Sequence, residues 1–118
     1  MNIKDAMKEL MDIDGATAAM IVDSDSGMIL AQSGGGLNLD LAAAGNTEVV
    51  RAKRKTMASL KLDDHIEDFL ITLGKQFHIL RPLKDKQNIF IYSVLDKSRA
   101  NLGMARLVIA GVESNIKF

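Results

Sequence analysis

Three apolar runs decide the fold: HIEDFLITL at residues 65–73, QFHILR at 76–81 and IFIYSVL at 89–95. Only Gly74 and Lys75 separate the first two runs. A Gly-X pair between β-rich runs is typical of a tight hairpin, because glycine adopts the positive φ of a primed turn. We therefore predict an antiparallel meander. Glu67 and Asp68 suit its first strand to a sheet edge, whereas the third strand is apolar as if covered on both faces.

The segments on either side of the meander show helix and strand periodicities. Residues 3–11 carry apolar side chains at the spacing of a short amphipathic helix. Two short strands, 16–22 and 28–31, flank a polar turn. Residues 38–60 favour a long helix rich in Ala, Leu, Arg and Lys, and Asp96 or Ser98 can cap a final helix.

This order predicts an α+β domain with the arrangement αββαβββα, a five-stranded antiparallel sheet with helices on both faces. At 118 residues, the chain has the length of one domain, 1–118. Fifteen basic and fifteen acidic residues balance, which argues against nucleic-acid binding because phosphate affinity rests on a basic excess. The absence of cysteine excludes disulfides and sulfur-ligated metals. Without a secretory signal or an apolar run of membrane-spanning length, we expect a cytoplasmic protein that does not insert into membranes.

No motif in the sequence predicts a catalytic, cofactor or metal site. Gly34–Gly36 precedes a helix but lacks the Lys and hydroxyl of a phosphate loop, so we interpret it as a flexible connection. Asp23–Gly27 has the wrong glycine spacing for a calcium loop. His65 and His78 fall on neighbouring strands of the predicted hairpin, but two imidazoles without a third ligand make a poor zinc site.

The long helix carries two adjacent apolar stripes and a basic cluster. One stripe contains Ala42, Gly45, Val49, Ala52 and Thr56, and the other contains Leu39, Ala43, Asn46, Val50 and Met57. Two stripes indicate either two buried faces or one buried face beside a partner. The basic cluster, Arg51–Lys55, has two interpretations: a solvated helix face, or the charged rim of an apolar docking surface.

Three segments resemble bacterial roadblock-family proteins. They are AAAGNTEVVRAK at 42–53, DDHIEDFLITLGKQ at 63–76 continuing to ILRPL at 79–83, and LDKSRANL at 95–102. The resemblance covers essentially the whole chain. It implies a profilin-like domain related to dynein light chains of the roadblock type.

The resemblance also implies a function, because family members form homodimers and bind Ras-like small GTPases. The resemblance therefore implies a homodimeric regulator or scaffold that modulates the nucleotide cycle of a GTPase and is not itself an enzyme. Pairing with another roadblock chain is an alternative to the homodimer. The dimer interface implied by the resemblance contains Val49, Val50, Met57, Ile66, Asp68, Leu70 and Thr72, and the partner-binding surface contains Lys53, Arg54 and Met57.

Two further hypotheses concern function. An arginine inserted into the GTPase site is chemically feasible, with Arg51, Arg54, Arg81, Arg99 and Arg106 as candidates. The alternative to GTPase binding is a profilin-like or PAS-like sensor of a small ligand, or a general protein-interaction scaffold. A sensor requires a concave pocket, and the shortage of aromatic residues, four Phe and one Tyr without Trp, argues against one.

Overall fold

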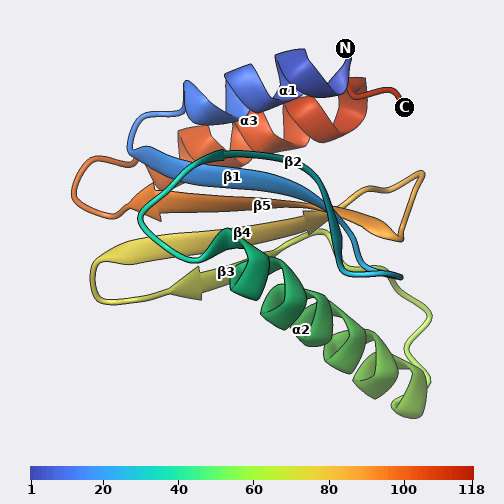
Figure 1. Ribbon diagram of the computed structural model, residues 1–118. Coiled ribbons are helices and arrows are strands. Elements are labelled where there is room, and N and C mark those ends of the chain that lie inside the picture. Colours follow the sequence, from blue (N-terminus) through green and yellow to red (C-terminus); the bar gives the residue numbers. More distant parts are fainter.

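A computed structural model describes all residues, 1–118, and confirms the arrangement αββαβββα (Figure 1). Helix α1 spans Ile3–Met11, strand β1 Ala16–Asp23, strand β2 Met28–Gly34 and helix α2 Leu39–Ser59. The meander consists of β3, Phe69–Thr72, β4, Gln76–Pro82, and β5, Ile89–Asp96. Helix α3, Leu102–Asn115, ends the fold. No helix has both the length and the apolar character needed to cross a membrane.

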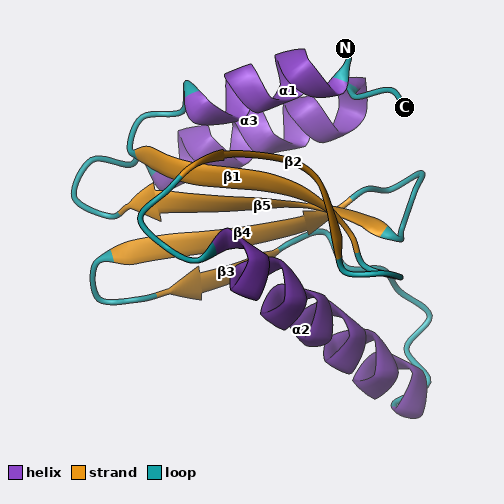
Figure 2. Cartoon of the chain, in the orientation of Figure 1, coloured by secondary structure: helices purple, strands orange, loops and turns teal.

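The five strands form one antiparallel sheet in the order β2-β1-β5-β4-β3. Strand β5 lies at its centre and is buried along Ile89–Leu95, as its apolar sequence predicts. Helices α1 and α3 cover one face and α2 crosses the other (Figure 2). Each face therefore has its own apolar core, with Leu10 and Ile109 in one and Val50 and Tyr92 in the other.

Side-chain caps start all three helices. The side-chain oxygens of Asn2, Asn38 and Asn101 accept the N–H of the residue three positions on, at 2.8–3.1 Å. The expected cap of α3 at Asp96 or Ser98 is therefore wrong. The Asp96 carboxylate instead accepts from Ser98 and Arg99 within the preceding turn. These hydrogen bonds, chiefly those from Ser98, lower the pKa of Asp96.

Strand β3 is shorter than the expected 65–73 and covers only Phe69–Thr72. Leu83 donates its N–H to Ile89 on β5 at 2.8 Å, so alternation along β4 turns the nitrogen of Pro82 toward β3. Because proline has no N–H, the pairing of β3 with β4 cannot continue past this point. His65 consequently lies on an irregular segment and does not face His78 across a hairpin.

The β3–β4 turn also differs from the expectation. Leu73 donates its N–H to Gln76 at 2.8 Å, which makes Gly74 and Lys75 the two central residues. Gly74, however, is not among the glycines with positive φ, so the hairpin is tight but does not use the expected primed-turn conformation.

Candidate functional site

Strand β3 presents an unpaired backbone edge to solvent. Because Leu73 bonds to Gln76 on β4, alternation directs the N–H and C=O groups of Phe69 and Ile71 toward β4 as well. The backbone groups of Leu70 and Thr72 therefore point away from the sheet. We call these outward groups the open edge of β3. Its four residues hold no charge, proline or bulge, and such an edge can pair with another strand.

The opposite edge of the sheet is less suited to pairing. Strand β2 pairs Ala31 with Ile21 and Ile29 with Val22, which leaves Leu30 as an extra residue in a bulge. A bulge bends the strand and disrupts the regular spacing of its outward groups. Of the two edges, β3 is therefore the regular one.

Helix α2 buries only one of its two stripes. Ala43, Thr47 and Val50 are its buried side chains, and all lie in the first twelve residues. The other stripe is exposed at Gly45, Val49, Ala52 and Thr56, with the Val49 side chain 39% exposed. We call these four residues the outward stripe. In Figure 1 the second half of α2 runs beyond the strands, so a single chain leaves that half of the helix largely uncovered.

Some side chains of the basic cluster of α2 form hydrogen bonds within the chain, and others extend into solvent. Arg51 donates to the carbonyl of Asp25 at 2.6 Å, and Arg54 donates to the carbonyl of Gln87 at 2.5 Å. These bonds tie α2 to the β1–β2 and β4–β5 turns. Burial lowers the pKa of Arg54, although the charge of Asp25 opposes this. Lys53 is exposed, and it makes neither a salt bridge nor a hydrogen bond through its side chain.

The residues expected at the dimer interface occupy different environments. Leu70 is 38% exposed and Thr72 is exposed on β3, whereas Val50 is fully buried beneath its own helix. Asp68 is 8% exposed in its side chain and bonds to Arg106 of the same chain. Met57 and Ile66 line a surface hollow of about 590 Å³ beside Arg54 and Leu62. The structure thus groups Met57 with Ile66, and separates both from the buried Val50.

No protein-family model and no curated protein matches the sequence. A roadblock/LC7 domain from Streptomyces avermitilis superposes with a TM-score of 0.79 over 97% of this chain and 93% of that one, at 12% identity. MglB from Myxococcus xanthus gives a TM-score of 0.80 over 95% and 91%, at 14% identity. The chain has the bacterial roadblock fold. A further MglB structure, described as having a tetrameric arrangement, superposes with a TM-score of 0.79 over 93% of this chain and 81% of that chain, at 17% identity.

All five arginines of this roadblock fold are engaged within the chain. Arg51 and Arg54 bond to turn carbonyls, Arg99 pairs with Asp96, and Arg81 and Arg106 bond to acidic side chains. An arginine that enters a partner's site would first have to leave these contacts. Sequence reasoning missed this, since the partners of Arg54, Arg81 and Arg106 lie 32 to 38 residues away.

Under α2 the roadblock fold holds a polar cluster on the sheet. The Tyr92 hydroxyl lies 3.0 Å from Nδ1 of His78, and Nε2 of His78 lies 2.8 Å from Oε1 of Gln76. Since the Gln76 oxygen only accepts, Nε2 of His78 donates to it, and in the neutral ring Nδ1 then accepts from Tyr92. Burial lowers the pKa of His78. Burial also raises the pKa of Tyr92, and a hydrogen bond with Asn46 opposes that second shift. Burial therefore favours the neutral imidazole in this cluster.

We expect acidification to destabilise the fold through His78. Because its pKa is lower folded than unfolded, the unfolded chain takes up the proton first. Stability is complete above the ordinary histidine pKa of about 6.5 and is lost as the pH falls toward the folded-state pKa. Urea unfolding between about pH 7.5 and 5.5 should show a smaller loss for His78→Gln than for wild type. An equal loss would contradict this role, and His65→Gln, at an exposed histidine, is the control.

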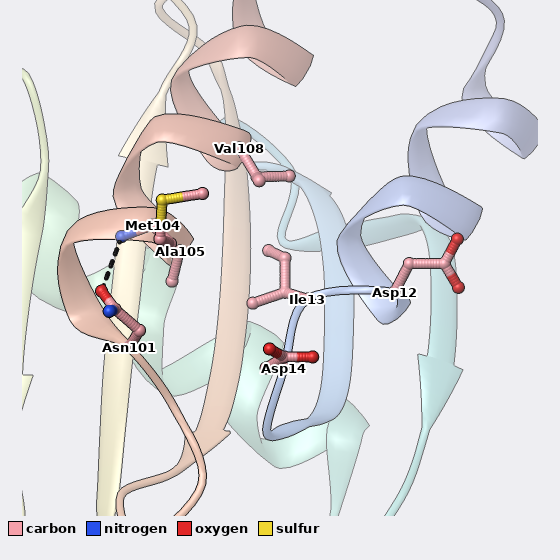
Figure 3. A pocket seen from close by; sticks show the side chains of 7 residues that line it. All are labelled: Asp12, Ile13, Asp14, Asn101, Met104, Ala105 and Val108. Atoms are coloured by element: carbon pink, nitrogen blue, oxygen red, sulfur yellow. Dashed lines mark hydrogen bonds between the residues drawn. The ribbon is translucent and has the colours of Figure 1, made fainter.

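The hollow between the end of α1 and the start of α3 bears on the ligand-sensor alternative. Its volume is about 310 Å³, and Ile13, Met104, Ala105 and Val108 form its apolar part (Figure 3). It opens on the helical surface, and no aromatic side chain or residue of a strand lines it. Nowhere do three His, Asp or Glu side chains gather closely enough to hold a metal. No observation of this hollow favours a ligand sensor.

Proposed function

We propose that the chain is a non-enzymatic, homodimeric regulator or scaffold that binds a Ras-like small GTPase and modulates its nucleotide cycle in the cytoplasm. One observation carries the proposal: the outward stripe and the open edge belong to two neighbouring elements, α2 and β3, which pack together on one face of the sheet. Phe69 and Ile71 of β3 pack in the same apolar cluster as Ala43 and Val50 of α2. A second copy, or a related roadblock chain, would cover both features at once.

Pairing through β3 would continue the sheet into the second copy and set the two α2 helices side by side. Val49, Met57, Leu70 and Thr72 would then form the contact, with Ile66 at its border. Val50 and Asp68 would support this surface from within their own chain. The fold shared with an MglB of tetrameric arrangement supports self-association. The near-zero net charge also does little to keep copies apart.

The solution mass of the wild-type chain tests the dimer. Sedimentation equilibrium should give twice the 12.8 kDa of a single chain at micromolar concentration. A mass of one chain across the whole concentration range would contradict the proposed assembly.

The resemblance to roadblock proteins implies that the paired α2 helices are the docking surface for the GTPase. Its switch segments are held by γ-phosphate contacts and are therefore sensitive to a docking partner. Because the arginines are engaged in their own chain, we expect this protein to act by ordering residues of the GTPase. Lys53 is charged, makes no contact through its charge within the chain and lies beside the outward stripe, so it is the residue best placed to contact the GTPase.

We expect Lys53→Glu to weaken GTPase binding several-fold and to leave the fold intact, because exposed charges contribute little to stability. The loss should shrink at high salt, which screens exposed charges. Titration of the GTPase with each variant measures this. Lys4→Glu, on α1 at the opposite face, is the matched control. Equal affinity for wild type and Lys53→Glu would remove Lys53 from the docking surface. Arg54 is unsuitable for this test because reversal of its charge would also release the β4–β5 turn.

A further inference from the structure

Four charged side chains form a cluster where the chain enters β3. Arg106 on α3 donates from two nitrogens to the Asp68 carboxylate, at 3.0 and 2.9 Å. Arg81 on β4 lies 3.9 Å from the same carboxylate and donates to Glu113 on α3 at 3.3 Å. Two positive and two negative charges therefore join the residue before β3 to both β4 and α3.

Within the cluster, Arg106 is the main ion-pair partner of Asp68. The Asp68 side chain is 8% exposed, and a carboxylate in that position needs a partner to offset its lost hydration. Arg81 is a weaker partner because it is farther away and is shared with Glu113. The two parallel bonds from Arg106 also fix the orientation of the carboxylate, as bidentate arginine pairs do.

The chain just before β3 has little else to hold it. Residues 62–68 have no regular secondary structure, and only Ile66 and Asp68 among them are even partly buried. Backbone pairing with β4 begins at Phe69, since Pro82 offers no N–H further back. The other end of β3 is secured by the Leu73 to Gln76 hydrogen bond. The chain that enters β3 is therefore held chiefly by Asp68, while Phe69 itself packs in the apolar cluster under α2.

We propose that Arg106 is a positioning residue for the open edge of β3, which it holds in place through Asp68. The inference rests on the proposed dimer, in which that edge pairs with a second copy. Loss of the anchor frays a strand of only four residues from its first residue. The outward backbone groups of Leu70 are then no longer fixed where a partner strand needs them.

Residue-resolved amide exchange, measured by NMR, separates the anchor from the dimer. The N–H groups of Phe69 and Ile71 face β4, so they are protected even in a single chain. Those of Leu70 and Thr72 face outward and become protected only when a second strand pairs with them. Arg106→Leu should speed exchange at Phe69 and Ile71 at least about tenfold, even under monomeric conditions, and raise the dimer dissociation constant at least about tenfold.

Two variants show whether the effect is specific. Arg106→Lys keeps the charge but loses the paired bonds, so it should restore part of the protection. Arg99→Leu removes an exposed ion pair at the turn before α3 and should change neither quantity. Exchange at Phe69 and Ile71 that is equal in wild type and Arg106→Leu overturns the role of Arg106 in any oligomeric state. A wild-type chain that remains monomeric overturns the proposed dimer instead. A lowered unfolding midpoint with unchanged exchange and dimer affinity would show a merely structural role and also overturn the inference.

Discussion

Thr72→Pro should convert the proposed dimer into folded monomers. The Thr72 N–H points away from β4, so proline removes no hydrogen bond of the β3–β4 ladder. It removes one outward donor from each copy and leaves two acceptors unpaired across the interface. At about 1–3 kcal/mol for each unpaired group, the dissociation constant should rise at least about 30-fold. Sedimentation equilibrium measures the mass, and circular dichroism confirms the fold.

Two controls isolate the backbone effect. Thr72→Val keeps the N–H at the same position and should remain dimeric. Gln32→Pro removes an outward N–H from β2, where the bulge already interrupts the opposite edge, and it should also remain dimeric. If Thr72→Pro is folded and dimeric, the interface does not use the open edge of β3.

Gly34→Ala, at the end of β2, should cause the largest loss of stability among single substitutions in the Gly34–Gly36 segment. Gly34 has φ +82°, and a Cβ built there would lie 2.1 Å from the carbonyl oxygen of Thr17 on the neighbouring strand. The left-handed conformation costs about 1–2 kcal/mol, and overpacking adds about 1–3 kcal/mol. We therefore expect the free energy of unfolding in urea to fall by about 2–5 kcal/mol.

Gly35→Ala is the matched control, one residue along the chain. Gly35 lacks a positive φ, and no atom lies within 4 Å of the position its Cβ would take. Alanine there should leave stability unchanged or raise it by up to about 1 kcal/mol, because it restricts the unfolded chain. Equal losses for the two variants would show that the close approach of Gly34 to Thr17 is unimportant.

Local pattern predicted most of the fold. The apolar run at Ile89–Leu95 identified the central strand, and the apolar spacing in residues 3–11 identified the first helix. The Gly34–Gly36 segment was misjudged as simply flexible, because its constraint is a contact with Thr17, a residue on another strand. Sequence shows that a glycine is present but not which backbone it approaches.

The candidate site was predictable only in outline. The sequence shows the two stripes of α2 as a repeated spacing of apolar residues. Only the packing of the helix against the sheet shows that Val50 is buried while Val49 faces outward. Asp68 was expected within the edge strand, but it precedes β3, and its carboxylate is held by Arg106 from 38 residues away. Long-range ion pairs leave no periodic signal, which is why the start of β3 and the engagement of the arginines emerged only from the structure.

Affinity capture from the lysate of the source cell tests whether this chain binds a Ras-like GTPase. Wild type and Thr72→Pro serve as baits, each in the presence of GDP or a non-hydrolysable GTP analogue, and bound proteins are identified by mass spectrometry. We expect wild type to retain a Ras-like GTPase in one nucleotide state and the monomeric variant to retain much less. If wild type retained no GTPase in either state, the chain would share the roadblock fold without the proposed role.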